Sequence, residues 1–317
     1  MKQEDKRLLK PSFAIAATLV AVLLLSTLIV TERGDCGESV SWKLRANGKL
    51  TVQGDGPIPD YDVKEDPSPF YNRSVVTADL QEGITAIGDN AFNGCLNMRK
   101  INIPQSVTSI GAKAFSGCTK LSDVDIDKNN AAFTFENGTL FTADGTSLLF
   151  RSQQAGEKEY TVPQGVTSIA EEAFFGNKKL TRIDLPESLT EIGEGAFRGC
   201  TKLEKITVPE KLDFSFEDGV LYGKDDTVLL FCAPAAGKES FTAPSGVRTV
   251  GASAFSGCKA LTSVTLPAGI TTVGENAFRG CTKLTDVYFQ GTQEAWGRVA
   301  GGAEAFAELE DVTIHFR

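Results

Sequence analysis

Hydrophobic positions recur with a fixed period along most of this chain. The pair Ala-Phe occurs six times in one local pattern, and successive phenylalanines are 23, 59, 23, 58 and 23 residues apart. The two long spacings equal one 23-residue unit plus inserts of 36 and 35 residues. Units of this size cannot bury an apolar face alone, so the period predicts a solenoid of stacked coils with a shared core. The phenylalanines are Phe92, Phe115, Phe174, Phe197, Phe255 and Phe278.

Each unit contains the pattern of a short strand. Residues 189–209 read LTEIGEGAFRGCTKLEKITVP, in which Leu203, Ile206 and Val208 have the spacing of alternately buried strand positions. Pro209 ends the strand because proline has no N–H to donate. Stacking the units would align these strands in parallel, about 4.8 Å apart.

A chain reversal precedes the strand in each unit. Gly193 permits a positive φ or a close backbone approach, and Ala196-Phe197 fits one helical turn that packs a large ring into the core. We therefore predict a mostly-β solenoid of short parallel strands in 23-residue coils, with short helical turns on the convex side.

The two inserts resemble each other. Residues 133–150 read FTFENGTLFTADGTSLLF, and residues 214–231 read FSFEDGVLYGKDDTVLLF. An Asn-Gly or Asp-Gly pair between alternating apolar residues indicates a β-hairpin. We predict two hairpin inserts, near 127–162 and 209–243, each an extended coil with a projecting hairpin.

The two ends differ from the repeats, as the caps of a solenoid should. Residues 40–52 read VSWKLRANGKLTV, which predicts a hairpin whose Trp42 covers the first coil. Residues 292–300 read TQEAWGRVA, which predicts a short helix carrying Trp296, before a closing strand at 311–316.

The N-terminus carries an uncharged, apolar run. Residues 12–30 read SFAIAATLVAVLLLSTLIV, and nineteen residues at about 1.5 Å each nearly cross a bilayer core. The run is longer than most signal-peptide cores and no Ala-x-Ala follows it, which favours a retained transmembrane anchor over a cleaved signal peptide. Four preceding cations keep the N-terminus in the cytoplasm and export the rest: Lys2, Lys6, Arg7 and Lys10.

These patterns divide the chain into five parts. We expect a cytoplasmic tail at 1–11, a transmembrane signal-anchor at 12–30, and a linker with the N-terminal hairpin cap at 31–72. The solenoid with its inserts would occupy 73–289, and the C-terminal cap 290–317.

Charge excludes several classes of function. The chain has 32 Lys and Arg against 41 Asp and Glu, a net charge of −9, so it has no electrostatic footprint for nucleic acid. The single histidine, His315, removes most histidine-based metal and acid–base sites. The sequence also has no phosphate-binding or nucleophile-elbow motif. We expect no enzyme activity, no cofactor and no metal site.

The unit I-G-x-x-A-F-x-G-C-x-x-L-x-x-I-x-I-P resembles the BspA-type leucine-rich repeat surface proteins of bacteria. The resemblance covers about residues 75–289, and the third unit departs from it with Ala170 and Asn177 at the turn glycine and the cysteine. It implies a leucine-rich repeat solenoid displayed at the cell surface for binding or adhesion, and it names no ligand.

The predicted strands offer a candidate binding face. If their apolar positions point inward, two columns of side chains are exposed, and we expect them on the concave side; a merely solvated face is an equal alternative. The exposed hairpin tips near Asn137 and Asp218 are rival contact sites, because loops on rigid scaffolds often carry recognition. The columns are Lys100, Asp123, Arg182, Lys205, Ser263 and Asp286, and Asn102, Asp125, Asp184, Thr207, Thr265 and Tyr288.

Two further patterns have ordinary structural interpretations. Five of the seven cysteines share one repeat position, which predicts a column of buried thiols; Cys36 and Cys232 lie outside it and are the candidates for reactive thiols. Residues 125–136 nearly match the spacing of a calcium-binding loop, but we favour a solvated acidic turn.

We expect an exported protein, anchored in the membrane by its N-terminal helix or secreted if that segment is cleaved. Its partner would be a protein or a glycan. The alternative is an envelope scaffold that organises the cell's own surface proteins.

Overall fold

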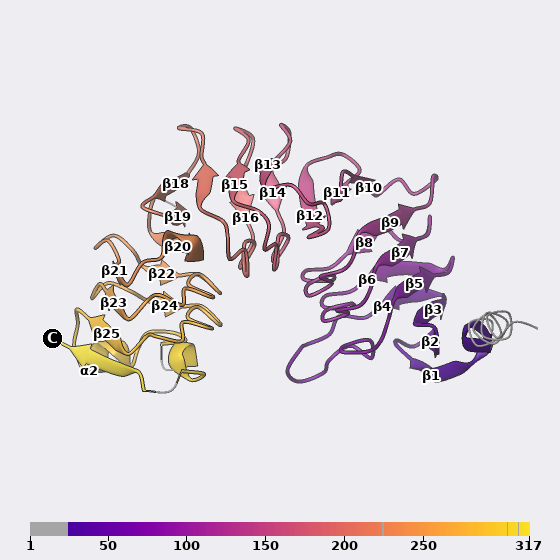
Figure 1. The fold of residues 1–317 in the computed structure, drawn as a ribbon, viewed down its shortest axis with the longest axis horizontal. Helices are drawn as coiled ribbons and strands as arrows, with labels where there is room; N and C mark the ends of the chain where they lie inside the picture. Colours follow the sequence, from indigo (N-terminus) through magenta and orange to yellow (C-terminus); the bar gives the residue numbers. More distant parts are fainter. Residues whose placement is uncertain (1–24, 224, 303, 310) are drawn as a thin grey trace, which may run out of the picture.

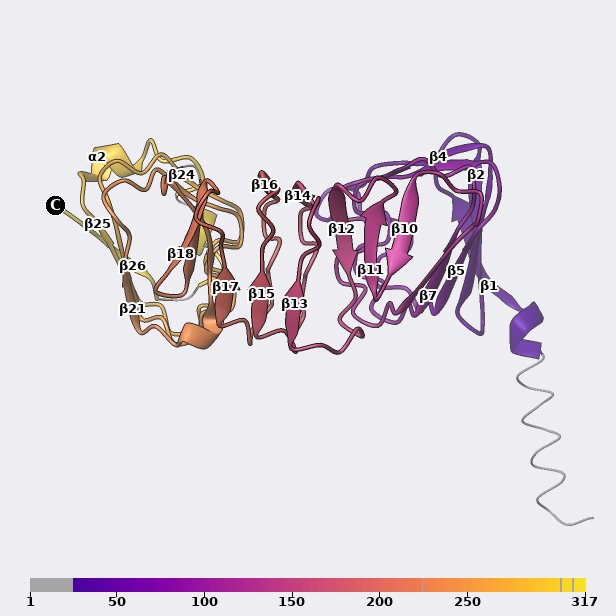
Figure 2. The same ribbon diagram turned by 90° about the horizontal axis from the view of Figure 1, so that it is seen from above.

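The computed structural model describes residues 25–223, 225–302, 304–309 and 311–317. They form a mostly-β solenoid whose stacked coils follow an arch from one end of the chain to the other (Figure 1). Figure 2 shows the coils from above as successive rungs, with β13, β15 and β17 side by side. The predicted solenoid is therefore confirmed.

Each coil contributes one strand to an outer strand column, in which neighbouring coils pair in parallel. The column is split into three sheets, because β9 does not pair with β13 nor β17 with β21. The strands are β5 (Thr77–Leu80), β7 (Lys100–Ile103), β9 (Asp123–Ile126), β13 (Glu159–Thr161), β15 (Arg182–Asp184), β17 (Lys205–Thr207), β21 (Ser240–Thr242), β23 (Ser263–Leu266), β25 (Asp286–Phe289) and β26 (Thr313–Phe316).

A second column of strands lies on the other side of the core. In the repeats that keep the turn glycine, the strand ends at the Ile or Val before this glycine, and neighbouring strands of the column pair in parallel from coil to coil. The strands are β4 (Gly56–Ile58), β6 (Ile84–Ile87), β8 (Ser109–Ile110), β12 (Ser147–Arg151), β14 (Ser168–Ile169), β16 (Glu191–Ile192), β20 (Val228–Cys232), β22 (Thr249–Val250) and β24 (Thr272–Val273).

The six Ala-Phe pairs lie in hydrogen-bonded turns rather than in helices. The residue before each pair has a positive φ, between 52° and 60°, and this left-handed residue interrupts a right-handed helix. These turns lie on the inner side of the arch, so the expectation of convex helical turns is wrong on both counts. The left-handed residues are Asn90, Lys113, Glu172, Gly195, Ser253 and Asn276.

The first glycine of the turn is required for a close approach. A Cβ on Gly193 would lie 2.4 Å from the backbone nitrogen of Glu171 in the preceding coil. We expect Gly193→Ala to lower the free energy of unfolding by about 1–3 kcal/mol, because the coils must separate to admit the methyl group. Gly246→Ala is the matched control, since nothing lies within 4 Å of its added Cβ. Denaturant unfolding measures both, and equal losses would contradict this reason.

Each insert contains a hairpin and one further coil. In the first insert, β10 (Phe133–Glu136) and β11 (Thr139–Thr142) pair through the predicted Asn137-Gly138 turn. The next strand, β12, then pairs in parallel with β14, so it belongs to the second strand column. The hairpin therefore extends this sheet instead of projecting from it. The second insert repeats the arrangement with β18 (Phe214–Glu217), β19 (Val220–Gly223), β20 and β21.

Both caps have the predicted elements. At the N-terminal end β1 (Val30–Asp35), β2 (Val40–Arg45) and β3 (Lys49–Gly54) form antiparallel pairs, and the Trp42 ring packs edge-on against Phe70 at 5.8 Å. At the other end, Thr292 is the N-cap of α2 (Gln293–Trp296), and its side-chain hydroxyl accepts a hydrogen bond from the Ala295 N–H. Strand β26 closes the last sheet against β25.

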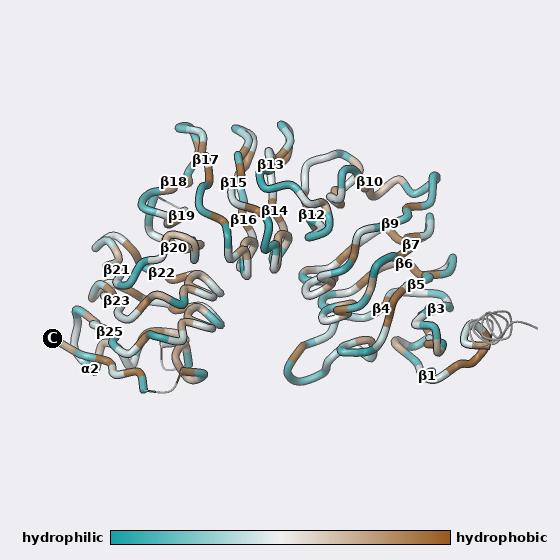
Figure 3. Tube along the Cα trace, in the orientation of Figure 1, coloured by the Kyte–Doolittle hydropathy of each residue, from teal (hydrophilic) through white to brown (hydrophobic). Residues whose placement is uncertain are grey.

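A ladder of aromatic rings fills the core but is interrupted at both inserts. The first ladder runs from Trp42 to Phe150, the second from Tyr160 to Phe231, and the third begins at Phe241. The buried apolar residues form three clusters with matching boundaries. Figure 3 shows the corresponding alternation of hydrophobic and hydrophilic positions along each coil. The solenoid therefore consists of three packed modules.

The expected transmembrane anchor at 12–30 falls mostly outside the described residues. Residues 25–28 are helical and Val30 already belongs to β1. Within the described part of the chain, no helix is both long and apolar enough to cross a membrane.

Candidate functional site

The outer strand column presents the candidate binding residues in two registered rows. Within each module, the residues of one row pair directly with each other across neighbouring strands: Lys100 with Asp123, Arg182 with Lys205, and Ser263 with Asp286. The second row continues in the same way, with Asn102 beside Asp125, Asp184 beside Thr207, and Thr265 beside Tyr288.

The structure corrects the side of the arch on which these rows lie. Figure 1 shows β5, β7, β9, β21, β23 and β25 on the outer side of β6, β8, β22 and β24, so the rows face away from the concave side. The coils pack closely at the turn glycines of the first two modules: a Cβ on Gly117 would lie 3.1 Å from Gly94, and one on Gly199 would lie 3.0 Å from Gly176. These turns form the inner edge of the arch.

In the first module, the row residues neutralise one another. Lys100 Nζ lies 3.1 Å from Asp123 and 3.0 Å from Asp125. Hydrogen bonds to Asp125 and then to Asp123 raise the pKa of Lys100. The Asn102 amide both donates to and accepts from the backbone of Leu80, each at 2.9 Å. This part of the surface is polar, and its charges are already paired.

The middle module has a similar arrangement. Arg182 Nε lies 2.9 Å from Asp184, and another guanidinium nitrogen of Arg182 donates to the Thr207 hydroxyl at 3.3 Å. A hydrogen bond from Thr207 is the main cause that lowers the pKa of Asp184, and Arg182 adds to it. Lys205 is exposed beside this cluster.

The last module ends the rows in an aromatic pair. The Tyr288 ring, 45% exposed, stacks on His315 at 4.6 Å between centroids. His315 Nε2 lies 2.7 Å from Asp286, and this hydrogen bond lowers the pKa of Asp286. Strand β26 carries His315, as the sequence indicated for the terminal strand. Tyr288 is thus an exposed aromatic side chain whose ring is held against His315.

Sequence reasoning missed several members of the rows. The insert strands β13 and β21 supply Glu159 and Ser240 beside Arg182 and Ser263. The sequence signal that could have identified these strands lies at the end of each insert. There Val162-Pro163 and Ala243-Pro244 follow the strand, as a proline does in a full repeat. The cap strand β3 adds Lys49, whose Nζ lies 2.8 Å from Asp79.

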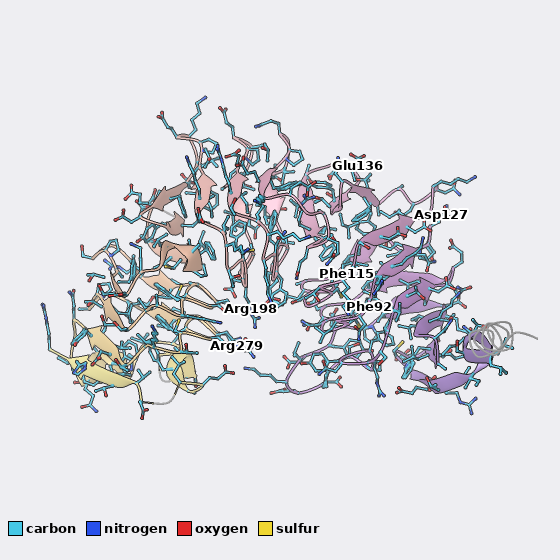
Figure 4. The ribbon with its side chains drawn as sticks, viewed as in Figure 1. Phe92, Phe115, Asp127, Glu136, Arg198 and Arg279 are labelled. Carbon is cyan, nitrogen blue, oxygen red and sulfur yellow. The ribbon has the colours of Figure 1, made fainter. Side chains whose placement is uncertain are left out.

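The concave side is lined by the turns and is also charged. Figure 4 labels Arg198 and Arg279 on this inner edge. Arg198 donates at 2.6 Å to Glu172, a carboxylate only 7% exposed, which also accepts from the Ser116 hydroxyl. At the mouth of the arch, Lys64, which lies in the segment between β4 and β5, forms an ion pair with Glu275 beside the sixth turn, at 2.6 Å. A pocket of about 440 Å³ lies beside this pair.

Residues 125–136, whose spacing nearly matches a calcium-binding loop, make other contacts in the structure. Asp125, on β9, forms an ion pair with Lys100. The Asp127 carboxylate accepts a hydrogen bond from the backbone N–H of Asn129 at 2.8 Å. Figure 4 labels Asp127 and Glu136 on separate segments. Among the described residues, no three His, Cys, Asp or Glu side chains gather where they could hold a metal ion.

The hairpin tips at Asn137 and Asp218, the rival contact sites, are exposed.

All seven cysteines are free and buried. Each thiol of the predicted column donates to a backbone carbonyl of the preceding coil, at 3.1 to 3.6 Å. Burial raises the pKa of Cys95, Cys200 and Cys281 to about 12 each, so these thiols are inert. In the third unit, the Asn177 side chain instead accepts from the backbone N–H groups of Lys179 and Leu180.

Several solved structures resemble the chain. A leucine-rich repeat protein of Eubacterium ventriosum is 26% identical, with a TM-score of 0.45, over 82% of this chain and 72% of that one. A leucine rich cell surface protein of Faecalibacterium prausnitzii is 19% identical, with a TM-score of 0.44, over 83% and 96%. The pneumococcal vaccine antigen PcpA is 16% identical, with a TM-score of 0.43, over 91% and 99%.

No curated protein sequence matches the chain. The family model of the BspA type leucine rich repeat region, in contrast, matches it in six copies, over residues 66–142, 150–222 and 235–310. These ranges cover most of the solenoid and leave out 143–149 and 223–234, which lie within the two inserts. The chain belongs to the BspA-type leucine-rich repeat family.

Proposed function

We propose that this protein is a non-enzymatic recognition protein of the bacterial cell surface, which binds a protein or glycan partner in adhesion or recognition. One observation carries the proposal: the outer strand column presents two registered rows of polar side chains that end at the exposed Tyr288. Exposed aromatic rings on rigid elements are the usual anchors of binding surfaces. The repeat family is one that is not generally enzymatic, which agrees with a binding role.

We also propose that residues 12–30 anchor the protein in the membrane and that the solenoid is exported. Support comes from the apolar sequence and from its described end, where Leu28 is 75% exposed and Ile29 51% exposed. Antibody labelling of intact cells against residues 36–317 tests this. Strong labelling is expected, and labelling that appears only after the envelope is opened would favour the scaffold alternative.

The binding proposal predicts a specific effect at Tyr288. We expect Tyr288→Ala to weaken binding to the cognate protein or glycan by roughly tenfold or more, as loss of an aromatic anchor does. Leu96→Ala is the matched control, because Leu96 is similarly exposed (49%) but lies outside the rows. Array screening with the purified protein, followed by titration of each hit, measures the effect. Equal affinities for both variants would place the binding site elsewhere.

A further inference from the structure

One pair of cysteines is arranged differently from the rest of the thiol column. In four coils, the column thiol donates to the carbonyl of a phenylalanine in the preceding coil. In the fifth repeat, the thiol of Cys258 donates instead to the carbonyl of Cys232, at 3.6 Å. The two residues are 26 positions apart, the same separation as Cys200 and Phe174.

Cys232 occupies this place because the second insert contains a degenerate coil. Its backbone N–H donates to Ala254 at 2.7 Å, as Phe174 donates to Ala196 in a full repeat. The neighbouring Phe231 supplies the core ring, 5.7 Å from Phe197. Because Phe231 supplies the ring, the position that holds phenylalanine in a full repeat can hold a cysteine in this coil, and it holds Cys232.

The corresponding places of the first insert hold no thiol. Arg151 is the equivalent of Cys232, since its backbone N–H donates to the carbonyl of Ala173. In the next coil, Asn177 stands at the position of the column cysteine. Among the described column cysteines, Cys258 is the one whose thiol donates to the carbonyl of another cysteine.

The geometry suits a covalent bond between the pair. The Cys258 sulfur lies 3.6 Å from the carbonyl oxygen of Cys232, which places the two residues side by side in neighbouring coils. Both residues are buried, with 2% and 6% exposure. The side-chain hydrogen bond between the two residues is the main cause that lowers the pKa of Cys232 and raises the pKa of Cys258.

We propose that Cys232 and Cys258 are an oxidation site, where a peroxide converts the two thiols into an intrachain disulfide. The Cys232 thiolate attacks one peroxide oxygen, the O–O bond breaks, and a sulfenic acid forms as hydroxide leaves and takes up a proton. The Cys258 sulfur then attacks the sulfenic sulfur, the S–S bond forms, and the second water leaves. Two thiols are oxidised and one peroxide is reduced to two waters.

The oxidant is a peroxide rather than a protein disulfide, because both thiols are buried and a mixed disulfide with a protein would not fit. The bond would tie the second insert to the turn of the fifth repeat. It would close a chain segment of 26 residues. We therefore expect the oxidised protein to unfold at a temperature higher by on the order of 5 °C.

The test treats the native, full-length protein with hydrogen peroxide, blocks the remaining thiols with N-ethylmaleimide and maps the peptides by mass spectrometry. We expect a crosslinked pair of peptides containing Cys232 and Cys258, with the mass of two hydrogens lost. A bond between Cys258 and Cys281, or full alkylation of all seven cysteines, would overturn the proposal.

Two variants separate the chemical role of the pair from a structural one. In Cys258→Ser, oxidation should stop at the sulfenic acid of Cys232, which dimedone traps. Cys281→Ser is the matched control, since it removes the equivalent thiol of the next coil and should leave the crosslink intact. Loss of the crosslink in Cys281→Ser with retained folding would contradict the assignment, and the wild-type map decides the question if Cys258→Ser does not fold.

Discussion

Phe255→Ala is expected to lower the free energy of unfolding by about 3–5 kcal/mol. The ring is fully buried and lies 5.1 Å from Phe241 and 5.0 Å from Phe278, measured between centroids. Its removal forfeits both the burial of the ring and its contacts, and the stacked coils cannot close the resulting cavity. Denaturant unfolding monitored by circular dichroism measures the loss.

The interrupted ladder makes this loss local. Phe255 belongs to the third cluster, whereas Phe92 belongs to the first, and no ring contact joins the ladders across the described inserts. Amide hydrogen exchange should therefore accelerate in residues 240–306 and stay slow in residues 77–126. Phe316→Ala is the control, because that ring is 38% exposed at the end of the stack. Equal acceleration in all three modules would show that the solenoid unfolds as one unit.

Arg198→Met should cost about 3–5 kcal/mol, because it leaves the buried carboxylate of Glu172 without its cation. Arg198 is 19% exposed and Glu172 7% exposed, so water cannot replace the lost partner. The Ser116 hydroxyl remains as a donor but carries no charge. Thermal or denaturant unfolding of the variant measures this loss.

The repeat supplies a matched control for this prediction. Arg279 occupies the same position in the sixth turn, but its pair with Glu308 is 3.5 Å long and both side chains are more than half exposed. Arg279→Met should therefore change stability by no more than about 1 kcal/mol. Adding Glu172→Gln to Arg198→Met should recover part of the loss, since it removes the buried charge. Equal costs for the two arginine variants would refute the role of burial.

The candidate surface shows how far the sequence can predict a site. The period of 23 residues and the two-residue alternation of strands place Lys100, Asp123 and their equivalents in rows, because strand pairing preserves register. The side of the arch could not be obtained in this way. Curvature is the sum of small differences in spacing between the two sides of each coil, and those depend on contacts between backbones such as Gly199 against Gly176.

The inserts show a second limit. Their Asn137-Gly138 and Asp218-Gly219 turns predict hairpins directly, since both residues of each turn require a positive φ. The coil that follows each hairpin lacks the Ala-Phe signature, so only its pairing with β14 or β22 identifies it as a repeat. The contact between Cys232 and Cys258 also depends on that coil, so the sequence pattern alone does not predict it.

The sequence by itself thus determined the repeating unit, the strand rows, the caps and the family, because these follow from local periodicity and turn chemistry. The tertiary structure alone decided that each turn contains a left-handed residue and lies on the inner edge, that the core is divided into three modules, and that Glu172 contacts Arg198 and Ser116. These features arise from how one coil packs on the next, and side chains from different coils meet only when the stack has formed.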